Sequence, residues 1–319
     1  MIRRYTHWRA TVVPVAAVAA LLAACGGGGT GAGPGADGQS PPARQEGPTI
    51  DIGSFNFPES EILAEIYAQG LDAHGYPVAT KQGIGSREVT QPALARGDID
   101  MIIEYTGNAL RFQRQGEQVD LREEQEVYDA LQEEYRDEGI TSLQMASAQD
   151  VDAVAVTREF AEQHDLDTIS DLATVPGTIT FGASPECPER LSCLRGLREV
   201  YGLDVEFKEL DAGGPVTVAA LARGEVDAAN LFTTQGVVAA NDFVLLEDDK
   251  NLQLPQNIVP VVRDGILDAY GEPFRELVNS VTAQITTNGL TELNKRVEVD
   301  KEDPSAVAED WLREHGFLD

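Results

Sequence analysis

The sequence predicts an α/β protein of two lobes, each built from the same unit. The first observation is a repeat: residues 93–106 read ALARGDIDMIIEYT, and residues 220–233, which lie 127 positions later, read ALARGEVDAANLFT. The second is that matches continue at the same offset without a gap: Ile52 with Ile179, Pro58 with Pro185, Glu59 with Glu186, Gly75 with Gly202, and Val78 with Val205. The third is that short apolar runs alternate with helical patterns, which is typical of α/β sheets.

Each copy begins with a short apolar strand, residues 50–53 in the first copy and 178–182 in the second. The loops that follow contain Pro58 and Pro185, each with a glutamate directly after it. Proline is tolerated at the first helical position, and a carboxylate is favourable near the positive end of a helix. We therefore expect a helix to begin at this point in both copies.

Within the first copy, apolar residues recur at helical spacing after Pro58 and end before Gly75. A second strand (residues 78–81) and a second helix (residues 86–96) lead to residues 98–103. This last segment is apolar enough to form a buried parallel strand.

The predicted strands indicate where a ligand would bind, because ligands of parallel α/β sheets bind beyond the carboxyl ends of the strands. The segments that follow strands are residues 54–56, 86–87 and 105–108 in the first copy, and residues 184–190 and 232–235 in the second. We expect Tyr105 and Phe232 on opposite walls of one cleft between the lobes. The alternative for both rings is packing in a core.

Polar residues in these segments are further candidates for ligand contacts: Ser54, Asn56, Ser86, Asn108 and Thr233. Ser86 has an alternative structural role, since serine is a good N-cap and a helix is expected to follow it. Arg87 either reaches the cleft or pairs with Glu88 and Asp98.

The N-terminal segment has the features of an export signal. Arg3, Arg4 and Arg9 precede an apolar stretch, residues 11–24, which is too short to be a membrane-spanning helix. The stretch ends in LAACG, which resembles the lipobox of bacterial lipoproteins. We interpret residues 1–24 as a signal peptide and Cys25 as the lipid acceptor, the alternative being an ordinary secretory signal.

The residues after Cys25 are mostly glycine, proline, alanine and polar residues up to position 48. Such a composition cannot bury enough apolar surface to fold, so residues 25–48 are expected to form a flexible tether. Export also explains the two remaining cysteines, since an even pair in an oxidising compartment indicates a disulfide between Cys187 and Cys193. No metal site is expected, because two thiols are too few and the four histidines lack ligand spacing.

The chain is strongly acidic, with a formal net charge of -30. This charge argues against nucleic acid as a partner, because phosphates require a basic surface. Two interpretations remain open. The acidic residues form a solvated surface, or some of them attract a cationic solute.

Several motifs together resemble the substrate-binding proteins of osmoprotectant ABC transporters, the glycine betaine/carnitine/choline family. They are IGSFNFPES at residues 52–60, GSRE at 85–88, EYTGN at 104–108, the segment 186–197, LFTT at 231–234, and DP and WL at 303–304 and 311–312. The resemblance covers residues 49–318 and implies a two-lobe type II periplasmic-binding-protein fold with a ligand cleft between the lobes. The expected division is residues 49–152 for the first part of lobe 1, 153–256 for lobe 2 and 257–319 for the return to lobe 1.

The family typically holds a quaternary ammonium in a cage of tyrosines, whose ring faces attract a cation. The resemblance places Tyr105 and Phe232 at two positions of this cage. Asp152 and Gln256 stand where two more tyrosines would be, and Asp150 matches an acidic position.

Other positions concern the rest of the ligand. Arg190 matches the arginine that clamps a ligand carboxylate, and the alternative for it is an ion pair at the surface or between the lobes. Phe55 replaces a lysine of the family, and Asn108 replaces a threonine. The two aspartates have the alternative of capping or solvating a hinge, and hinges are expected near residues 151–154 and 255–259.

The expected function is therefore an extracytoplasmic receptor, anchored to the cell membrane by lipid, that binds a small quaternary-ammonium or zwitterionic osmoprotectant. It would deliver this solute, as a monomer, to the permease of an ABC importer with its cytoplasmic ATPase. No cofactor or catalysis is expected. The alternatives are a more polar solute, whether ectoine-like, ergothioneine-like or derived from an amino acid, an enzyme on the same fold, and a sensor domain, which would need a further segment after Asp319.

Overall fold

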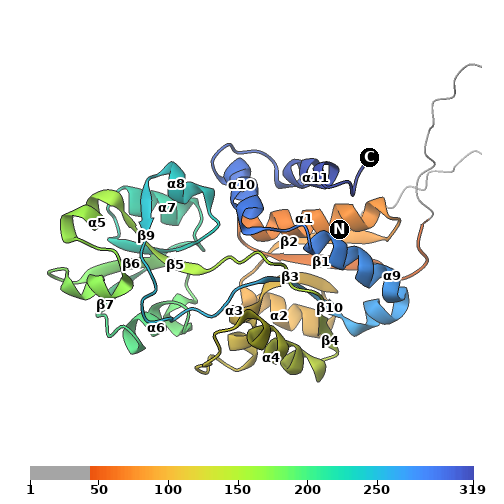
Figure 1. The fold of residues 1–319 in the computed structure, drawn as a ribbon, viewed down its shortest axis with the longest axis horizontal. Coiled ribbons are helices and arrows are strands. Elements are labelled where there is room, and N and C mark those ends of the chain that lie inside the picture. Colours follow the sequence, from red (N-terminus) through yellow and green to blue (C-terminus); the bar gives the residue numbers. More distant parts are fainter. Residues whose placement is uncertain (1–43) are drawn as a thin grey trace, which may run out of the picture. The chain divides into compact units, whose positions relative to one another are not determined.

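The computed structural model describes residues 44–319. The expected signal peptide, the lipid acceptor Cys25 and most of the expected tether lie outside these residues. The described chain contains two five-stranded sheets with helices packed around them, and we call the parts built on these sheets lobe 1 and lobe 2 (Figure 1).

The sheet of lobe 1 has the strand order β2-β1-β3-β10-β4. Its strands are β1 (Ile50–Phe55), β2 (Val78–Gly85), β3 (Met101–Tyr105), β4 (Ile140–Ser142) and β10 (Ile258–Arg263). β1 pairs in parallel with β2 and β3, whereas β10 runs antiparallel to both β3 and β4. The helices in this part of the chain are α1 (Pro58–Ala73), α2 (Arg87–Arg96), α3 (Thr106–Gln113), α4 (Glu124–Arg136), α9 (Asp264–Thr282), α10 (Thr287–Glu298) and α11 (Pro304–Glu314).

The sheet of lobe 2 has the order β7-β6-β8-β5-β9, with the same pattern of directions. Its strands are β5 (Asp152–Thr157), β6 (Ile179–Ala183), β7 (Val205–Glu209), β8 (Ala228–Phe232) and β9 (Phe243–Leu245). Its helices are α5 (Arg158–His164), α6 (Leu194–Glu199), α7 (Pro215–Ala222) and α8 (Gly236–Ala240). β3 and β8 lie 127 positions apart, as the repeat requires. The predicted fold class, α/β with two related lobes, is confirmed.

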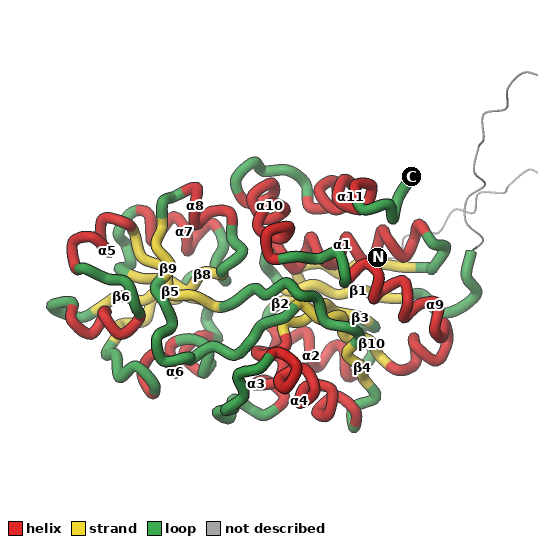
Figure 2. Tube along the Cα trace, in the orientation of Figure 1, coloured by secondary structure: helices red, strands yellow, loops and turns green. Residues whose placement is uncertain are grey.

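The chain crosses between the lobes twice. The first crossing joins β4 to β5 and the second joins β9 to β10, and both appear as loop segments that run between the sheets (Figure 2). They touch through an antiparallel bridge between Gln149 and Asn257. The strand that follows each crossing, β5 in lobe 2 and β10 in lobe 1, is the antiparallel strand of the sheet that the chain enters. The two lobes are therefore alike in how they are connected as well as in their topology.

One expected helix is wrong. α1 begins at Pro58 as predicted, but Pro185 lies in a turn, and α6 begins only at Leu194. The reason is the disulfide between Cys187 and Cys193, whose Cα atoms are 5.2 Å apart. Residues six positions apart in a continuous α-helix are separated by about 9 Å, so the bond is incompatible with a helix across this segment.

The cores lie between each sheet and its helices. In lobe 1, α1 is buried along most of its length because α11 and α10 cover it, and Leu312 of α11 is fully buried. Tyr67 of α1 is hydrogen-bonded to Thr282 at the end of α9 (2.8 Å). The C-terminal helices therefore pack on lobe 1, and α10 also contacts α8 of lobe 2.

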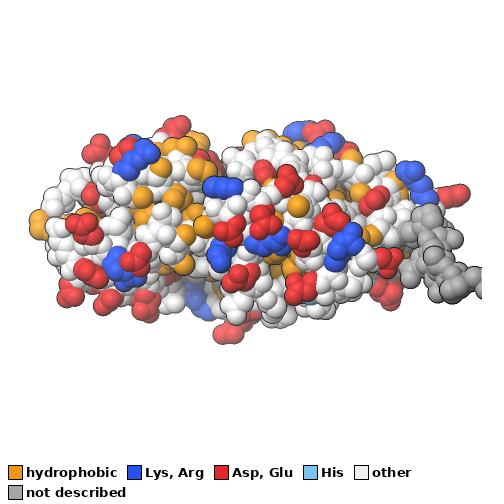
Figure 3. All heavy atoms as spheres, turned by 90° about the horizontal axis from the view of Figure 1, so that it is seen from above, with side chains coloured by type: hydrophobic (Ala, Val, Ile, Leu, Met, Phe, Trp, Pro, Cys, Tyr) orange, Lys and Arg blue, Asp and Glu red, His pale blue; other side chains and the backbone are white. Residues whose placement is uncertain are grey.

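Acidic side chains are spread over the face seen in Figure 3, on both lobes and among fewer basic ones. Over residues 44–319, no helix combines the length and the apolar character needed to cross a membrane. The same residues contain no group of three or more potential metal ligands.

Candidate functional site

A cavity of about 50 Å³ lies between the lobes, at the carboxyl ends of the central strands. Its wall contains eight of the predicted contact residues: Asn56, Ser86, Tyr105, Asn108, Asp150, Asp152, Arg190 and Phe232. Arg87, for which contact with the cleft was one alternative, also lines the cavity, as do residues outside the prediction, chiefly Phe55, Phe57, Glu186 and Asn230. A water molecule needs roughly 10–15 Å³ of such space, so the lobes lie nearly closed around a small volume.

Four aromatic rings form a cluster at the cavity. Phe57 is at its centre, with its ring centroid 5.6 Å from that of Phe55, 6.0 Å from that of Tyr105 and 5.5 Å from that of Phe232. The first three rings belong to lobe 1 and Phe232 belongs to lobe 2. The cage is thus richer in rings than the two predicted from the sequence, although three of the four rings are phenylalanines.

Arg87 is buried beside this cluster. Its guanidinium donates hydrogen bonds to both carboxylate oxygens of Glu104, at 2.7–3.2 Å, and its Cζ lies 5.1 Å from the centroid of the Phe55 ring. Of the two alternatives for Arg87, the structure has the first, since Arg87 lines the cavity. Its carboxylate partner is Glu104, whereas Asp98 pairs with Arg96. Glu104 keeps Arg87 in place at the end of β3, where one face of Phe55 is already covered by a cation.

Two carboxyl groups, Glu59 and Asp150, are buried beside the rings, and Asp150 also lines the cavity. Glu59, in the first turn of α1, accepts hydrogen bonds from Tyr105 Oη (2.8 Å), Thr234 Oγ1 (2.5 Å) and Asn294 Nδ2 (2.6 Å). Asp150 accepts a hydrogen bond from the backbone N–H of Thr234 (3.1 Å). The network joins α1, the first crossing, the loop after β8 and α10, so it spans both lobes.

Burial governs the ionisation of this pair. Burial raises the pKa of Asp150 well above its ordinary value, and the nearby charge of Glu59 raises it further. Burial also raises the pKa of Glu59, while the hydrogen bonds from Thr234, Asn294 and Tyr105 oppose the shift. Two interacting carboxyl groups in one buried site do not both ionise readily, so we expect the pair to share one proton over a range of pH.

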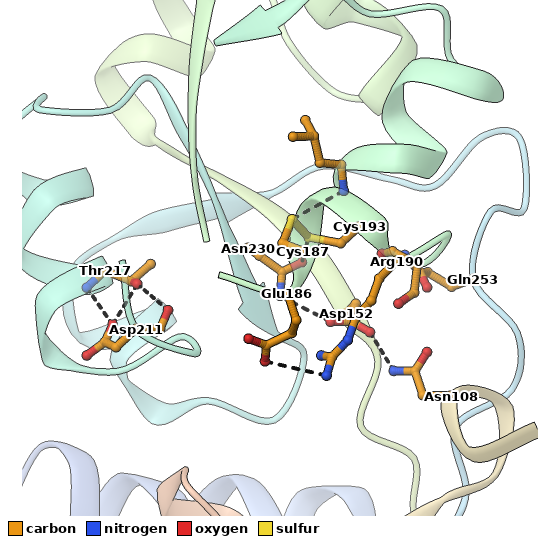
Figure 4. Close-up of a disulfide and its surroundings, with 12 residues drawn as sticks. Asn108, Asp152, Glu186, Cys187, Arg190, Cys193, Asp211, Thr217, Asn230 and Gln253 are labelled. Atoms are coloured by element: carbon orange, nitrogen blue, oxygen red, sulfur yellow. Dashed lines mark hydrogen bonds and ion pairs between the residues drawn. A yellow bond between two sulfur atoms is a disulfide. The ribbon is translucent and has the colours of Figure 1, made fainter. Parts of the chain in front are cut away.

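Asp152 stands at the start of β5, directly opposite Phe232 in the register of the lobe 2 sheet. Its carboxylate accepts hydrogen bonds from Asn108 Nδ2 (2.7 Å) and Asn230 Nδ2 (3.1 Å). Asn108 belongs to α3 of lobe 1 and Asn230 to β8 of lobe 2 (Figure 4). Asp152 therefore links the lobes at the edge of the cavity.

Arg190 lies in the loop that the Cys187–Cys193 disulfide closes, and it lines the cavity. Figure 4 shows its side chain beside Glu186. Its guanidinium makes two hydrogen bonds to the carboxylate of Glu88 and lies 3.4 Å from Glu186. Since Glu88 belongs to α2 of lobe 1, the structure places Arg190 in an ion pair between the lobes.

Three predicted contacts do not line the cavity, because their side chains bind other parts of the protein. Ser54 is fully buried and its Oγ accepts a hydrogen bond from the N–H of Gly83 (2.8 Å). Thr233 Oγ1 accepts from the N–H of Val151 (2.9 Å). Gln256 is fully buried, and its Oε1 accepts from the N–H of Asn108 (3.0 Å).

Sequence reasoning missed Phe57, Glu59 and Glu186 as components of the site. A signal existed for each, since Phe57 lies in a loop that follows a strand and the two glutamates are equivalent positions of the repeat. Ser86 does line the cavity, but its hydroxyl makes no capping bond and donates instead to Glu88 (2.6 Å).

The family model for the substrate-binding domain of ABC-type glycine betaine transport systems matches residues 48–314. The chain belongs to this family. Members of the family are extracytoplasmic solute-binding receptors that work with ABC permeases, and they are not enzymes.

Two curated relatives are similar along most of their length. A glycine-betaine-binding protein of Pseudomonas aeruginosa is 31% identical over 284 residues, which are 85% of this chain and 89% of that protein. The glycine betaine-binding protein YehZ of Escherichia coli is 28% identical over 278 residues, 84% of this chain and 91% of the relative.

Solved structures show the same fold. A crystal structure described as a glycine betaine/carnitine/choline ABC transporter superposes with a TM-score of 0.67, at 24% identity, over 85% of this chain and 100% of the other. The unliganded structure of YehZ from Escherichia coli has a TM-score of 0.61 at 29% identity, over 85% of this chain and 99% of the other.

Proposed function

We propose that this receptor binds a small quaternary-ammonium or zwitterionic osmoprotectant of the glycine betaine, choline or carnitine type and delivers it to an ABC importer. The observation that carries the proposal is the cluster of four rings at a cavity whose wall also holds Asp150 and Asp152. A quaternary ammonium has no N–H to donate, so ring faces and nearby carboxylates are the groups that attract it.

Binding requires the lobes to separate, because the cavity lies between them and residues of both lobes line it. The two crossings are the segments about which the lobes would move, and hinge closure of this kind is a common response to ligands. A solute that touches Phe57 on lobe 1 and Phe232 on lobe 2 stabilises the closed form, since it gains both contacts only there. We propose that the closed form is the one the permease recognises.

The cellular setting is part of the same proposal. Cys25 would carry the lipid, residues 25–48 would be the tether, and the receptor would act as a monomer with a permease and its cytoplasmic ATPase. The proposed lobes are residues 49–152 with 257–319, and residues 153–256. The order of the strands along the chain supports this division. The strands of the lobe 2 sheet begin at Asp152 and end before Ile258, and the strands of the lobe 1 sheet lie before and after them.

A calorimetric titration of residues 42–319, which form one compact unit, tests the ligand class. Glycine betaine, choline and carnitine are compared with 3,3-dimethyl-1-butanol, which has the shape of choline without its charge. We expect at least one of the cations or zwitterions to bind and the uncharged alcohol to bind far more weakly. Equal affinity for choline and the alcohol would show that the rings and carboxylates do not recognise a cation.

A more polar solute is the second candidate, and the observation that favours it is the pair of aspartates in the cavity wall, which accept N–H donors. A Helicobacter pylori protein named as an ergothioneine transport permease and ergothioneine-binding protein is 28% identical over 81% of this chain, which spans 46% of that relative. Ergothioneine and ectoine therefore belong in the same titration, and tight binding of either with no binding of choline would favour this candidate.

A further inference from the structure

Two cationic side chains line the cavity, and each is already paired with a carboxylate of the protein. Arg87 is held by Glu104 within lobe 1, as described above. Arg190 is held by Glu88 across the lobes, with its Nε 3.1 Å from Oε1 and its Nη2 2.7 Å from Oε2. Two parallel bonds from one guanidinium to one carboxylate form the geometry that arginine uses to bind a carboxylate ligand.

Glu88 is well placed to compete for Arg190. It lies in the first turn of α2, and the hydroxyl of Ser86 donates to its Oε2 (2.6 Å). Partial burial disfavours ionisation of Glu88, but the hydrogen bonds and the charge of Arg190 outweigh it and lower the pKa of Glu88 to about 2. Glu88 is therefore ionised at any physiological pH and is available to pair with this guanidinium whenever the lobes close.

The charge left over at the cavity wall is negative. Once Arg87 and Arg190 are paired, the carboxyl groups of Asp150, Asp152 and Glu186 have no full counter-charge among the lining residues, and Glu186 shares Arg190 only at 3.4 Å. Even with Asp150 protonated, two carboxylates face the space where a solute would sit. A net cation gains from this arrangement, whereas the carboxylate of a zwitterion would meet like charge and a guanidinium that is already occupied.

We propose that Glu88 is a specificity-determining residue, which occupies Arg190 and so selects a quaternary ammonium cation without a carboxylate over a zwitterion that carries one. The inference rests on the proposed function and narrows its solute class to choline-like cations. In this arrangement Arg190 joins the two lobes in an ion pair, and Glu88 occupies the guanidinium that the carboxylate of a betaine would need.

The test compares choline and glycine betaine as ligands of the wild type and of Glu88→Gln. We expect the wild type to bind choline at least about tenfold more tightly than glycine betaine, because a betaine must displace a charge-assisted pair. Glu88→Gln removes the competing charge, so we expect its affinity for glycine betaine to rise by about fivefold or more while that for choline stays the same or falls. Glu88 is exposed, so the substitution leaves the core intact.

Two controls separate this effect from a general change in charge. Glu189→Gln removes one exposed carboxylate next to Arg190 in the chain but outside its ion pairs, and it should leave the choline-to-betaine ratio unchanged. The double variant Glu88→Gln/Arg190→Gln should lose the gain in betaine affinity, because the freed guanidinium is then absent.

The outcomes distinguish a failure of the proposed function from a failure of the inference about Glu88. If choline, glycine betaine and carnitine all fail to bind the wild type, the proposed function is refuted and the inference falls with it. If both bind but the wild type prefers glycine betaine, or the ratio is the same in Glu88→Gln, the inference alone is refuted. A gain that persists without Arg190 would also overturn it, since the effect would then not pass through the guanidinium.

Discussion

Phe57 offers the sharpest test of the ring cluster, because it touches all three other rings and belongs to the opposite lobe from Phe232. Phe57 is only partly buried, whereas Phe55 is part of the core of lobe 1. Phe57→Ala should therefore remove a wall of the site without unfolding the protein. Phe55→Ala would confound binding with stability.

The magnitude of the effect follows from two contributions. A ring that contacts a desolvated cation contributes about 0.5–2 kcal/mol. The Phe57–Phe232 pair, at 5.5 Å between centroids, links the lobes in the closed form, and aromatic pairs contribute about 0.5–1.5 kcal/mol. Together we expect Phe57→Ala to weaken binding of a quaternary ammonium by about 1–3.5 kcal/mol, or roughly 5- to 370-fold in Kd.

Isothermal titration calorimetry measures this loss, and thermal unfolding checks that the variant remains folded. Phe57→Tyr keeps the ring and should bind nearly as well as the wild type. Phe57→Leu keeps apolar volume without a ring quadrupole and should resemble the alanine variant. Wild-type affinity in the folded alanine variant would refute the assignment of this ring to the site.

Three further predictions concern the pair of buried acids, the disulfide and the contact between α8 and α10. Burial and the nearby charges of Glu59 and Asp152 raise the pKa of Asp150, so the unliganded protein should lose stability as the pH rises above 3.8, while choline affinity rises. Asp150→Asn should flatten both profiles in calorimetry and thermal unfolding. The double variant Cys187→Ser/Cys193→Ser should loosen the loop that carries Arg190. The free energy of ligand binding should therefore fall by more than the free energy of unfolding, and equal losses in the two free energies would contradict this. Gly236→Ala places a Cβ 2.5 Å from the Cα of Lys295 in α10, so solution scattering should show a less closed form than in the control Gly265→Ala, where no atom lies within 4 Å of the added Cβ.

The topology of both lobes was predictable from the sequence, because the repeat keeps one offset and the strands are short apolar runs. Residues 101–105 and 228–232 became equivalent central strands, and the aromatic residue at the end of each lines the cavity. This prediction succeeded because strand formation depends on local composition, and the carboxyl ends of parallel strands meet at one edge of a sheet.

The partners of the charged residues were not predictable, because they depend on how the lobes meet. Arg190 and Glu88 are 102 positions apart in the chain, and Glu59 and Thr234 are 175 apart. No spacing rule connects such pairs. The helix expected at Pro185 is a different case, because the sequence alone could have excluded it. A helix across this segment would hold Cys187 and Cys193 too far apart for the disulfide that the sequence also predicts.

The repeat also explains the position of Thr233, which was expected to contact the ligand. Thr106 and Thr233 are equivalent residues, and each follows the aromatic residue that ends a central strand. The N–H of Thr106 donates to Asn257 O and its Oγ1 donates to Pro255 O, both in the second crossing. The N–H of Thr233 donates to Val151 O, and its Oγ1 accepts from Val151 N, in the first crossing. Each lobe thus fastens one crossing at the residue next to its cavity ring, so a rotation about the crossings moves both rings directly.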